Sequence, residues 1–259
     1  MKRMLDVIYE TVAVADAEIR KLLRDPTEMF SRAVQPVLWL AIFGQVFSQI
    51  RGIPTGNLRY LDYMTPGILA QSILFSAIFY GIAIIWERDL GIVHKLLVTP
   101  AHRSALVLGK AVAAGMRGLV QAVVVYLVAI ALQVDIRWEI WPMLTVAAAV
   151  FLGSCIFSTF SLVIACIVKT RERFMGIGQL LTMPLFFASN AIYPLDLMPA
   201  WLKTIAIFNP LTYLVDALRG AMISGGQSVY ADTTSFGVML MVFAVLLTLA
   251  SRLYPGLAR

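Results

Sequence analysis

The chain has 259 residues, of which 60% are hydrophobic and only 14% are charged. A soluble domain is nearer half apolar and a quarter charged, so this composition excludes a water-soluble fold and indicates an integral membrane protein. The net charge of +6 is what basic residues flanking membrane spans produce, and the sequence contains no Lys/Arg-rich run. We therefore expect membrane lipid, and no nucleic acid, among the partners.

Residues 1–26 predict an amphipathic helix that lies in the membrane interface. Apolar side chains between Leu5 and Leu23 fall near one face, and nine charged side chains occupy the rest of the helix. This segment carries too many charges to span a bilayer. Asp25-Pro26 is expected to end the helix, because proline disfavours helical backbone in the residue before it.

Six apolar segments follow, each long enough or nearly long enough to cross the hydrocarbon core as a helix. They are residues 33–50, 63–86, 105–134, 142–168, 174–193 and 236–253. No acidic residue falls within them, whereas the third carries Lys110 and Arg117 in its first half. We interpret both as long side chains that snorkel toward the cytoplasm, with a structural role for Arg117 preferred over that of a substrate ligand.

The basic residues predict that both termini are cytoplasmic, in the inner (plasma) membrane of a cell. With the N-terminus inside, fifteen of the 21 Lys and Arg residues lie on inner segments, Arg117 lies within a span and five lie on outer segments. The outer five are Arg51, Arg59, Arg137, Lys203 and Arg219. Residues 87–104 are then cytoplasmic and residues 194–235 external.

The external segment 194–235 is unusually apolar for a loop. Two stretches in it have helical spacing, and the second begins with Asn209 as a helix cap and Pro210 at the first helical position. Neither stretch is long enough to cross a bilayer. We expect two short helices that dip into the outer leaflet or pack over the ends of the spans.

The cytoplasmic loop 87–104 carries a short amphipathic pattern. The residues that form it are Glu87, Arg88, Leu90, Gly91, Val93, Lys95, Leu96 and Leu97. A helix over Glu87–Leu97 can fill a groove on a soluble protein with its apolar side, or it can lie on the membrane surface. The residues alone leave these two interpretations open.

Catalytic and metal-binding constellations are not found in the sequence. No His, Cys, Asp and Glu residues have metal-ligand spacing, and the single Gly-Lys pair lacks the Gly and Ser/Thr of a phosphate-binding loop, having Ser104 and Ala111 instead. We predict no catalytic residue, no metal and no cofactor bound by this chain. Polar residues of membrane spans usually form interhelical hydrogen bonds, and we take this as their expected role. Lining of a transport pathway is the more specific alternative. The candidates for pathway lining are Gln45, Gln49, Gln71 and Asn190.

Three motifs resemble ABC-2 type exporter permeases. The first is "ERDLGIVHKLLVTPAHRSALVLGK", from Glu87 to Lys110, which matches the family pattern except that Ile92 stands where Thr is usual. The second is "NPLTYLVDALRG", in which Pro210, Leu211, Tyr213 and Arg219 match. The third, "RDPTEMFSRAVQPVLWLAIFGQVF", resembles the start of the family's first span. The motifs occur in the family's order, and the drug-exporter and nodulation-lipid branch is the most similar.

The resemblance implies one all-α transmembrane permease domain over residues 1–259, with six spans. The 87–104 loop would hold the coupling helix, and residues 194–235 would be the external re-entrant pair that includes Asn209, Pro210, Tyr213 and Arg219. A second permease subunit, giving a homodimer, and two copies of a separate ATPase that binds ATP and Mg are implied as partners. The pathway would run between the two permeases, lined by the first, second and fifth spans.

The function implied is export of a hydrophobic or amphiphilic cargo, such as a drug, a lipid or a lipid-linked saccharide. ATP hydrolysis would occur on the partner, so the chain itself would be no enzyme. One alternative is a passive channel or scaffold without an ATPase partner. Another is a membrane enzyme that acts on lipid, for which the sequence offers no catalytic cluster at the interface.

Overall fold

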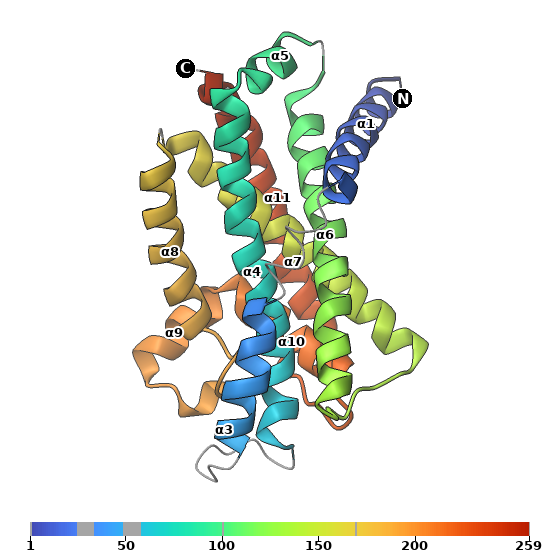
Figure 1. Ribbon diagram of the computed structural model, residues 1–259, viewed down its shortest axis with the longest axis vertical. Coiled ribbons are helices and arrows are strands. Elements are labelled where there is room, and N and C mark those ends of the chain that lie inside the picture. Colours follow the sequence, from blue (N-terminus) through green and yellow to red (C-terminus); the bar gives the residue numbers. More distant parts are fainter. Residues whose placement is uncertain (1, 25–33, 49–57, 100, 169, 259) are drawn as a thin grey trace.

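The computed structural model describes residues 2–24, 34–48, 58–99, 101–168 and 170–258. Within these ranges the secondary structure is helical, apart from one isolated antiparallel bridge between Ile136 and Ile223. The all-α expectation is confirmed. Figure 1 shows the helices as an elongated bundle, with both marked chain ends and α5 at one end and α3 and α9 at the other.

In the described part of the chain, four helices are long and apolar enough to cross a membrane. They are α4 (Tyr60–Asp89), α6 (Arg103–Ala131), α7 (Ile140–Ile167) and α11 (Asp232–Leu253), the last continuing into the 3-10 helix η3 (Tyr254–Ala258). Each contains one of the predicted spans almost completely. The protein is therefore a multi-helix membrane protein, as its composition predicts.

The other two predicted spans correspond to shorter helices. The predicted span 33–50 corresponds to an apolar helix over Val34–Phe47, which includes the π-helical turn η1 (Trp39–Gly44) and most of α3 (Gln45–Ser48). Residue 33 and residues 49–50 of the predicted span lie outside the described residues. Residues 174–193 correspond to α8 (Arg171–Phe187), which has 17 residues and contains Pro184. Neither is long enough to count as a span by length and composition alone.

The helix α1 (Lys2–Arg24) is amphipathic, as predicted for residues 1–26, and it packs along α6. Its Ala15 and Glu18 are buried against the bundle, whereas Ile8, Tyr9 and Val12 are exposed. Residues 25–33, which contain the predicted stop at Asp25-Pro26, lie outside the described residues.

Helix α7 lies at the centre of the bundle and packs against α4, α6, α10 and α11. Small side chains allow this close packing: Gly153, Ser154, Ser158 and Ser161 are buried on it, among others. One buried apolar cluster fills the half of the bundle near α10 and the start of α4. A second fills the half near α5 and the chain's C-terminal turn.

The external segment predicted at 194–235 contains the 3-10 turn η2 (Leu195–Leu197) and the helices α9 (Ala200–Phe208) and α10 (Pro210–Met222). The two short helices expected there are confirmed. Helix α10 packs over α4, α7 and α11, so this segment is part of the folded bundle and not a loose loop.

Candidate functional site

The predicted helix over Glu87–Leu97 is two helices in the structure. Helix α4 continues through Glu87 to Asp89, the chain turns at Leu90 and Gly91, and α5 spans Ile92–Val98. Gly91 adopts φ 72°, a left-handed conformation that glycine adopts without steric cost and that ends the helix before it. The expectation of one continuous helix is therefore wrong, because the sequence pattern did not separate the last turn of a span from the short helix after it.

Helix α5 has an inner and an outer side. Val93 is fully buried and Leu96 is partly buried, and both pack on the cluster at this end of the bundle. The outer side presents His94, Lys95 and Val98, with Val98 87% exposed, and Leu90 in the turn before α5 is 67% exposed. The expectation that Val93 and Leu96 lie on an outward apolar face is wrong: an amphipathic period does not distinguish a face turned to the same chain from one turned to a partner. Of the Leu97 side chain nothing is described.

Four charged side chains from three helices meet beside the start of α5. The Lys110 ammonium, on α6, donates to Glu18 Oε1 of α1 at 2.9 Å and to Glu87 Oε2 of α4 at 2.7 Å. Lys21 on α1 donates to Glu87 Oε1 at 2.6 Å and to Glu18 Oε1 at 3.3 Å. Cations and carboxylates thus alternate in a closed cycle of four, which we call the charge ring.

Burial makes the charge ring unusual. The Lys110 side chain is 2% exposed and those of Glu18 and Glu87 are 7% and 12% exposed, whereas Lys21 lies at the rim. Buried charges persist only when they are paired and hydrogen-bonded, and here each carboxylate contacts two ammonium groups. Burial raises the pKa of the Glu18 carboxyl, but Lys110, Lys21 and Arg117 together hold that pKa below its ordinary value.

Gly109 lets α1 approach α6 closely enough to form the charge ring. A Cβ atom at this position would lie 2.6 Å from Val14 Cβ and 2.9 Å from the Thr11 carbonyl oxygen, both on α1. These distances are too short for any side chain. The Gly109-Lys110 pair therefore provides both the close backbone contact and the charge that hold α1 in place.

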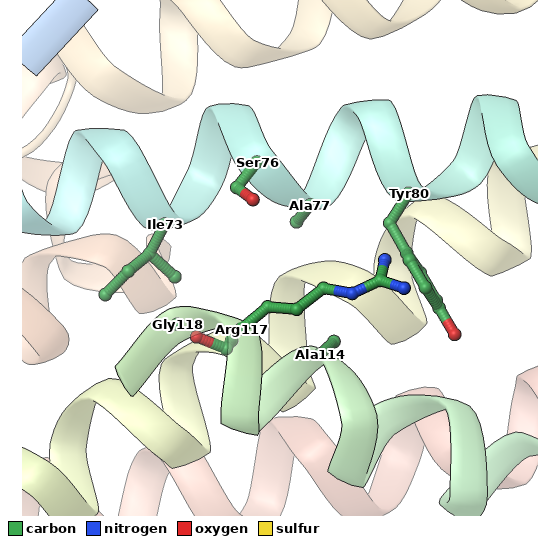
Figure 2. Close-up of a pocket in the computed structure, with 8 residues that line it drawn as sticks. Ile73, Ser76, Ala77, Tyr80, Ala114, Arg117 and Gly118 are labelled. Carbon is green, nitrogen blue, oxygen red and sulfur yellow. The ribbon is translucent and has the colours of Figure 1, made fainter. Parts of the chain in front are cut away.

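Arg117 follows Lys110 along α6, and its side chain is largely buried. Figure 2 shows its side chain extending from α6 to the ring of Tyr80 on α4, and its guanidinium carbon lies 4.9 Å from the ring centroid. One guanidinium nitrogen is 3.6 Å from Glu18 Oε2. The cavity beside it has a volume of about 10 Å³, which holds at most one water molecule. This geometry supports the structural interpretation of Arg117 over that of a substrate ligand.

Two further contacts tie the same end of the bundle together. His102, just before α6, donates its backbone N–H to Glu10 of α1 at 2.8 Å. Arg171, at the start of α8, donates to Asp89 at 2.6 Å and stacks on Trp86, with its guanidinium carbon 3.5 Å from the ring centroid. Arg88 also pairs with Asp89. The end that carries α5 therefore joins α1, α4, α6 and α8.

At the opposite end, the predicted cap of α10 is confirmed. Asn209 Oδ1 accepts the backbone N–H of Leu211 at 3.0 Å, and Pro210 occupies the first turn of the helix. The Asn209 amide also donates to the Leu185 and Ala188 carbonyl oxygens, at 2.6 and 3.0 Å. Asn209 thus joins the start of α10 to the end of α8.

Tyr213 and Arg219 make further contacts at this end, which we call the external contact region after the predicted side of residues 194–235. Tyr213 donates its hydroxyl to the Ile207 carbonyl of α9 at 2.8 Å. Buried Arg219 donates to the Asn190 carbonyl at 2.6 Å, and its guanidinium carbon lies 3.8 Å from the centroid of the Tyr63 ring. Nearby Asp216 accepts the N–H groups of Val229 and Tyr230; its burial raises its pKa more than these bonds lower it. The four motif residues are structural contacts within one chain.

Three of the four candidates for pathway lining lie in the described part of the chain. Gln71 and Asn190 are buried inside the chain, so they line no open pathway in this structure. Gln45 is exposed on α3, and Gln49 lies outside the described residues. Both side chains are enclosed, but the amide atoms of Asn190 have no hydrogen-bond partner, so the predicted interhelical hydrogen bond is not seen for this residue.

An apolar groove of about 710 Å³ lies between the last turns of α8 and α9. Pro184, Phe187, Trp201, Ile205 and Phe208 are among its lining residues. Its polar groups are used within the chain: Tyr193 donates to the Phe187 carbonyl, Thr204 to Ala200, and Asn209 to α8. The walls therefore offer surface for hydrocarbon and no charge.

Local sequence patterns do not identify Glu18 or Lys110 as partners of Glu87. Glu18 and Lys110 are 92 residues apart, and no local period links them. One signal was present: a lysine within an apolar span requires a nearby carboxylate, and Glu18 on the helix predicted to lie in the interface was available.

Known proteins were compared with the whole sequence. The sequence model of the family described as "ABC-2 type transporter" matches residues 9–223. A protein of Cyanophora paradoxa named as the transport permease ycf38 is 30% identical over 202 residues, covering 77% of this chain and 69% of that protein. DrrC of Mycobacterium tuberculosis, named as a doxorubicin resistance ABC transporter permease, is 23% identical over 219 residues, or 84% and 78% of the two chains. Nodulation protein J of Rhizobium leguminosarum bv. trifolii is 24% identical over 198 residues, or 75% and 74%.

The matched residues begin within α1 and end just after α10, so they include the charge ring, α5 and the external contact region. Two of the three relatives are named as permeases, in agreement with a bundle of long apolar helices. This chain therefore belongs to the ABC-2 type transporter family of membrane permeases.

Proposed function

We propose that the chain is the permease subunit of an ATP-binding-cassette exporter, driven by a separate ATPase that docks on α5. The observation that carries the proposal is the exposed outer side of α5, at the end of a bundle that belongs to a transporter family. In the described residues no group of His, Cys, Asp and Glu is placed to hold a metal ion. In this proposal the energy for transport comes from ATP, with Mg, bound by the partner.

Six membrane spans are part of the proposal. Four of the six spans are the long helices, and the other two are Val34–Phe47 and α8. These two have 14 and 17 residues and extend about 21 and 26 Å as helices. Both are shorter than a hydrocarbon core of about 30 Å, and neighbouring protein or local thinning of the bilayer compensates for the difference. An even number of crossings agrees with Figure 1, in which both chain ends lie at the α5 end.

We place the α5 end in the cytoplasm, at the inner (plasma) membrane, because basic residues are enriched there. Lys21, Lys95, Arg103, Arg171 and Arg252 all belong to this end under that orientation. The external contact region then lies on the far side. Labelling of single cysteines in sealed cells tests the orientation: Ser104→Cys is expected to be protected from an impermeant reagent, and Leu197→Cys is expected to react.

A second permease subunit is proposed because α8 packs on the bundle by one face only. Phe174, Gly178, Thr182 and Phe186 are buried at intervals of four residues, and Met175, Leu180 and Met183 are exposed. In a dimer the exposed side of α8 and the Val34–Phe47 helix would face the other subunit across the pathway. Two permeases would then bind two ATPase chains.

A hydrophobic or amphiphilic cargo is proposed. The uncharged groove between α8 and α9 supports a cargo with a hydrocarbon part. The names of two relatives, the doxorubicin resistance permease DrrC and the multidrug permease YbhR of Escherichia coli, point in the same direction. A small ion as cargo has less support, because the candidate polar residues Gln71 and Asn190 are enclosed within the chain.

Leu90→Asp tests the proposed function. Leu90 is exposed, so this change should leave the fold intact, whereas a carboxylate at an apolar docking contact should prevent binding of the ATPase. The matched control is Leu197→Asp, at a leucine that is 51% exposed on the external side. The measurements are co-purification of a co-expressed ATP-binding-cassette ATPase and ATP-driven export from membrane vesicles.

We expect Leu90→Asp to lose both co-purification and export, and Leu197→Asp to retain both. Cargo flux in the wild type without any ATP requirement would favour the alternative of a passive channel. Retention of full assembly and export in Leu90→Asp would remove α5 from the docking contact.

A further inference from the structure

The charge ring connects α1 with the end of α4, which leads into the helix α5 on which the proposed function places the ATPase. Glu87 lies on the last turn of α4, one helical turn before Gly91. A displacement of α5 is therefore expected to move Glu87 with it. Glu18 lies on α1, which is held on α6 at Gly109. Lys110 hydrogen-bonds to both carboxylates, and is the only residue of α6 in the ring.

The ring cannot stretch gradually. Because Lys110 is buried, breaking either of its two bonds leaves a carboxylate without a full set of partners in an environment with little water. A displacement of the α4 end by more than a hydrogen-bond length must therefore carry Lys110 and Glu18 with it, or pull the ring apart. Apolar contacts do not fix a register in the same way, because the hydrophobic effect is non-directional.

We propose that Lys110 is a positioning residue that makes the α4–α5 turn and α1 move as one body during transport. This inference rests on the proposed function, because the movement in question is the one that the ATPase would impose on α5. Lys110 contacts no cargo and no nucleotide in the proposal. It acts through Glu87 and Glu18, by fixing the register between three helices.

The first experiment uses the permease alone, so that its result does not depend on an ATPase. Spin labels at Ala17 on α1 and Val98 on α5, both exposed, report the distance between the two helices in lipid nanodiscs. Lys110→Met is expected to broaden the distance distribution, and Lys110→Arg to restore a narrow one. The matched control is Lys203→Met, because Lys203 lies on α9 at the far end. An unchanged distribution in Lys110→Met would overturn the proposal even if the chain is an exporter.

The second experiment separates positioning from stability. In the triple variant Glu18→Leu, Glu87→Leu, Lys110→Met, made in an Arg117→Met background so that no buried guanidinium loses its carboxylate, apolar side chains replace the buried charges, and such replacement is commonly neutral or stabilising. The thermal midpoint is therefore expected to match the wild type. The amount of cargo exported per ATP hydrolysed is expected to fall about tenfold, since the register between helices is no longer fixed.

Wild-type export efficiency in this stable triple variant would show that the ring only stabilises the fold, and would overturn the proposal. Absence of ATP-driven export in the wild type would instead refute the proposed function. The spin-label experiment would still show whether Lys110 fixes the distance between α1 and α5. Lys110→Arg in otherwise wild-type protein is expected to keep the wild-type amount of cargo exported per ATP. This result would support the need for a cation at this position.

Discussion

The two ends of the bundle hold their buried charges in different ways. At the α5 end, Lys110 contacts two carboxylates from two other helices. At the α9 end, buried Arg219 contacts a backbone carbonyl and an aromatic ring, and Asp216 accepts two backbone N–H groups. Loss of Lys110 takes one of two cationic partners from each of two buried carboxylates, whereas loss of Arg219 takes away the partner of a carbonyl dipole and an aromatic ring, and Asp216 keeps its two N–H donors. The comparison therefore predicts unequal responses to equivalent substitutions.

Lys110→Met is expected to have the largest effect. Removing one member of a buried ion pair costs about 3–5 kcal/mol, and we expect a loss of about 3 kcal/mol because Lys21 still contacts both carboxylates. The free energy of unfolding, measured by titration of micelles with sodium dodecyl sulfate, gives the value. A loss under about 1 kcal/mol would mean that the ring is already open to water.

Arg219→Met is expected to cost less, about 2 kcal/mol. The variant loses one hydrogen bond and one cation–π contact, and it also relieves the desolvation of a buried guanidinium. Measured by the same titration, a loss equal to or greater than that of Lys110→Met would contradict the distinction between the two ends.

Asn209→Ala is expected to cost about 1.5 kcal/mol, in the upper part of the range for loss of a helix cap. The reason is that the same amide also donates to two carbonyl oxygens of α8. Asn209→Asp keeps the cap acceptor and loses these donors, so the difference between the two variants separates the cap from the link to α8. Equal stability of Asn209→Ala and wild type would indicate that the external helices are not held by this residue.

Acid is expected to weaken the α5 end selectively. The pKa of Glu18 is held below its ordinary value in the folded chain, so its contribution to stability is fully present above the unfolded value of about 4.5 and is lost as pH falls through the lower folded value. Lys110, Lys21, Arg117 and Glu87 face this carboxyl. Hydrogen exchange of α1 should accelerate below about pH 4.5 relative to that of α10, once corrected for intrinsic rates. The same pH dependence in Glu18→Gln would assign the effect to other groups.

The sequence predicted the features that depend on neighbouring residues. The long apolar runs gave the four long helices, and Asn209-Pro210 gave the start of α10. Helix caps and apolar length act within one or two turns, so a single sequence contains them. The family resemblance was carried by these same local motifs.

The features that depend on three dimensions were not predicted. Lys110 was interpreted as a side chain that snorkels to the cytoplasm, but it is buried beneath α1 and paired with Glu18. Glu87 was interpreted as the first residue of the coupling helix, but α4 continues past it. Val93 and Leu96 showed the spacing of a docking face and pack inward instead. Periodicity shows that a helix has an apolar side, and it does not show what covers that side.

The contact between α5 and an ATPase is central to the proposed function, and site-specific cross-linking tests this contact directly. Val98→Cys and Leu197→Cys are made in a chain whose Cys155 and Cys166 have been replaced by Ala, and each is co-expressed with the ATP-binding-cassette ATPase. A short thiol-to-amine cross-linker is then applied to the purified complex. We predict a cross-linked permease–ATPase product from position 98 and none from position 197. A complex that co-purifies intact but yields no product from position 98, or yields equal product from both, would contradict the account.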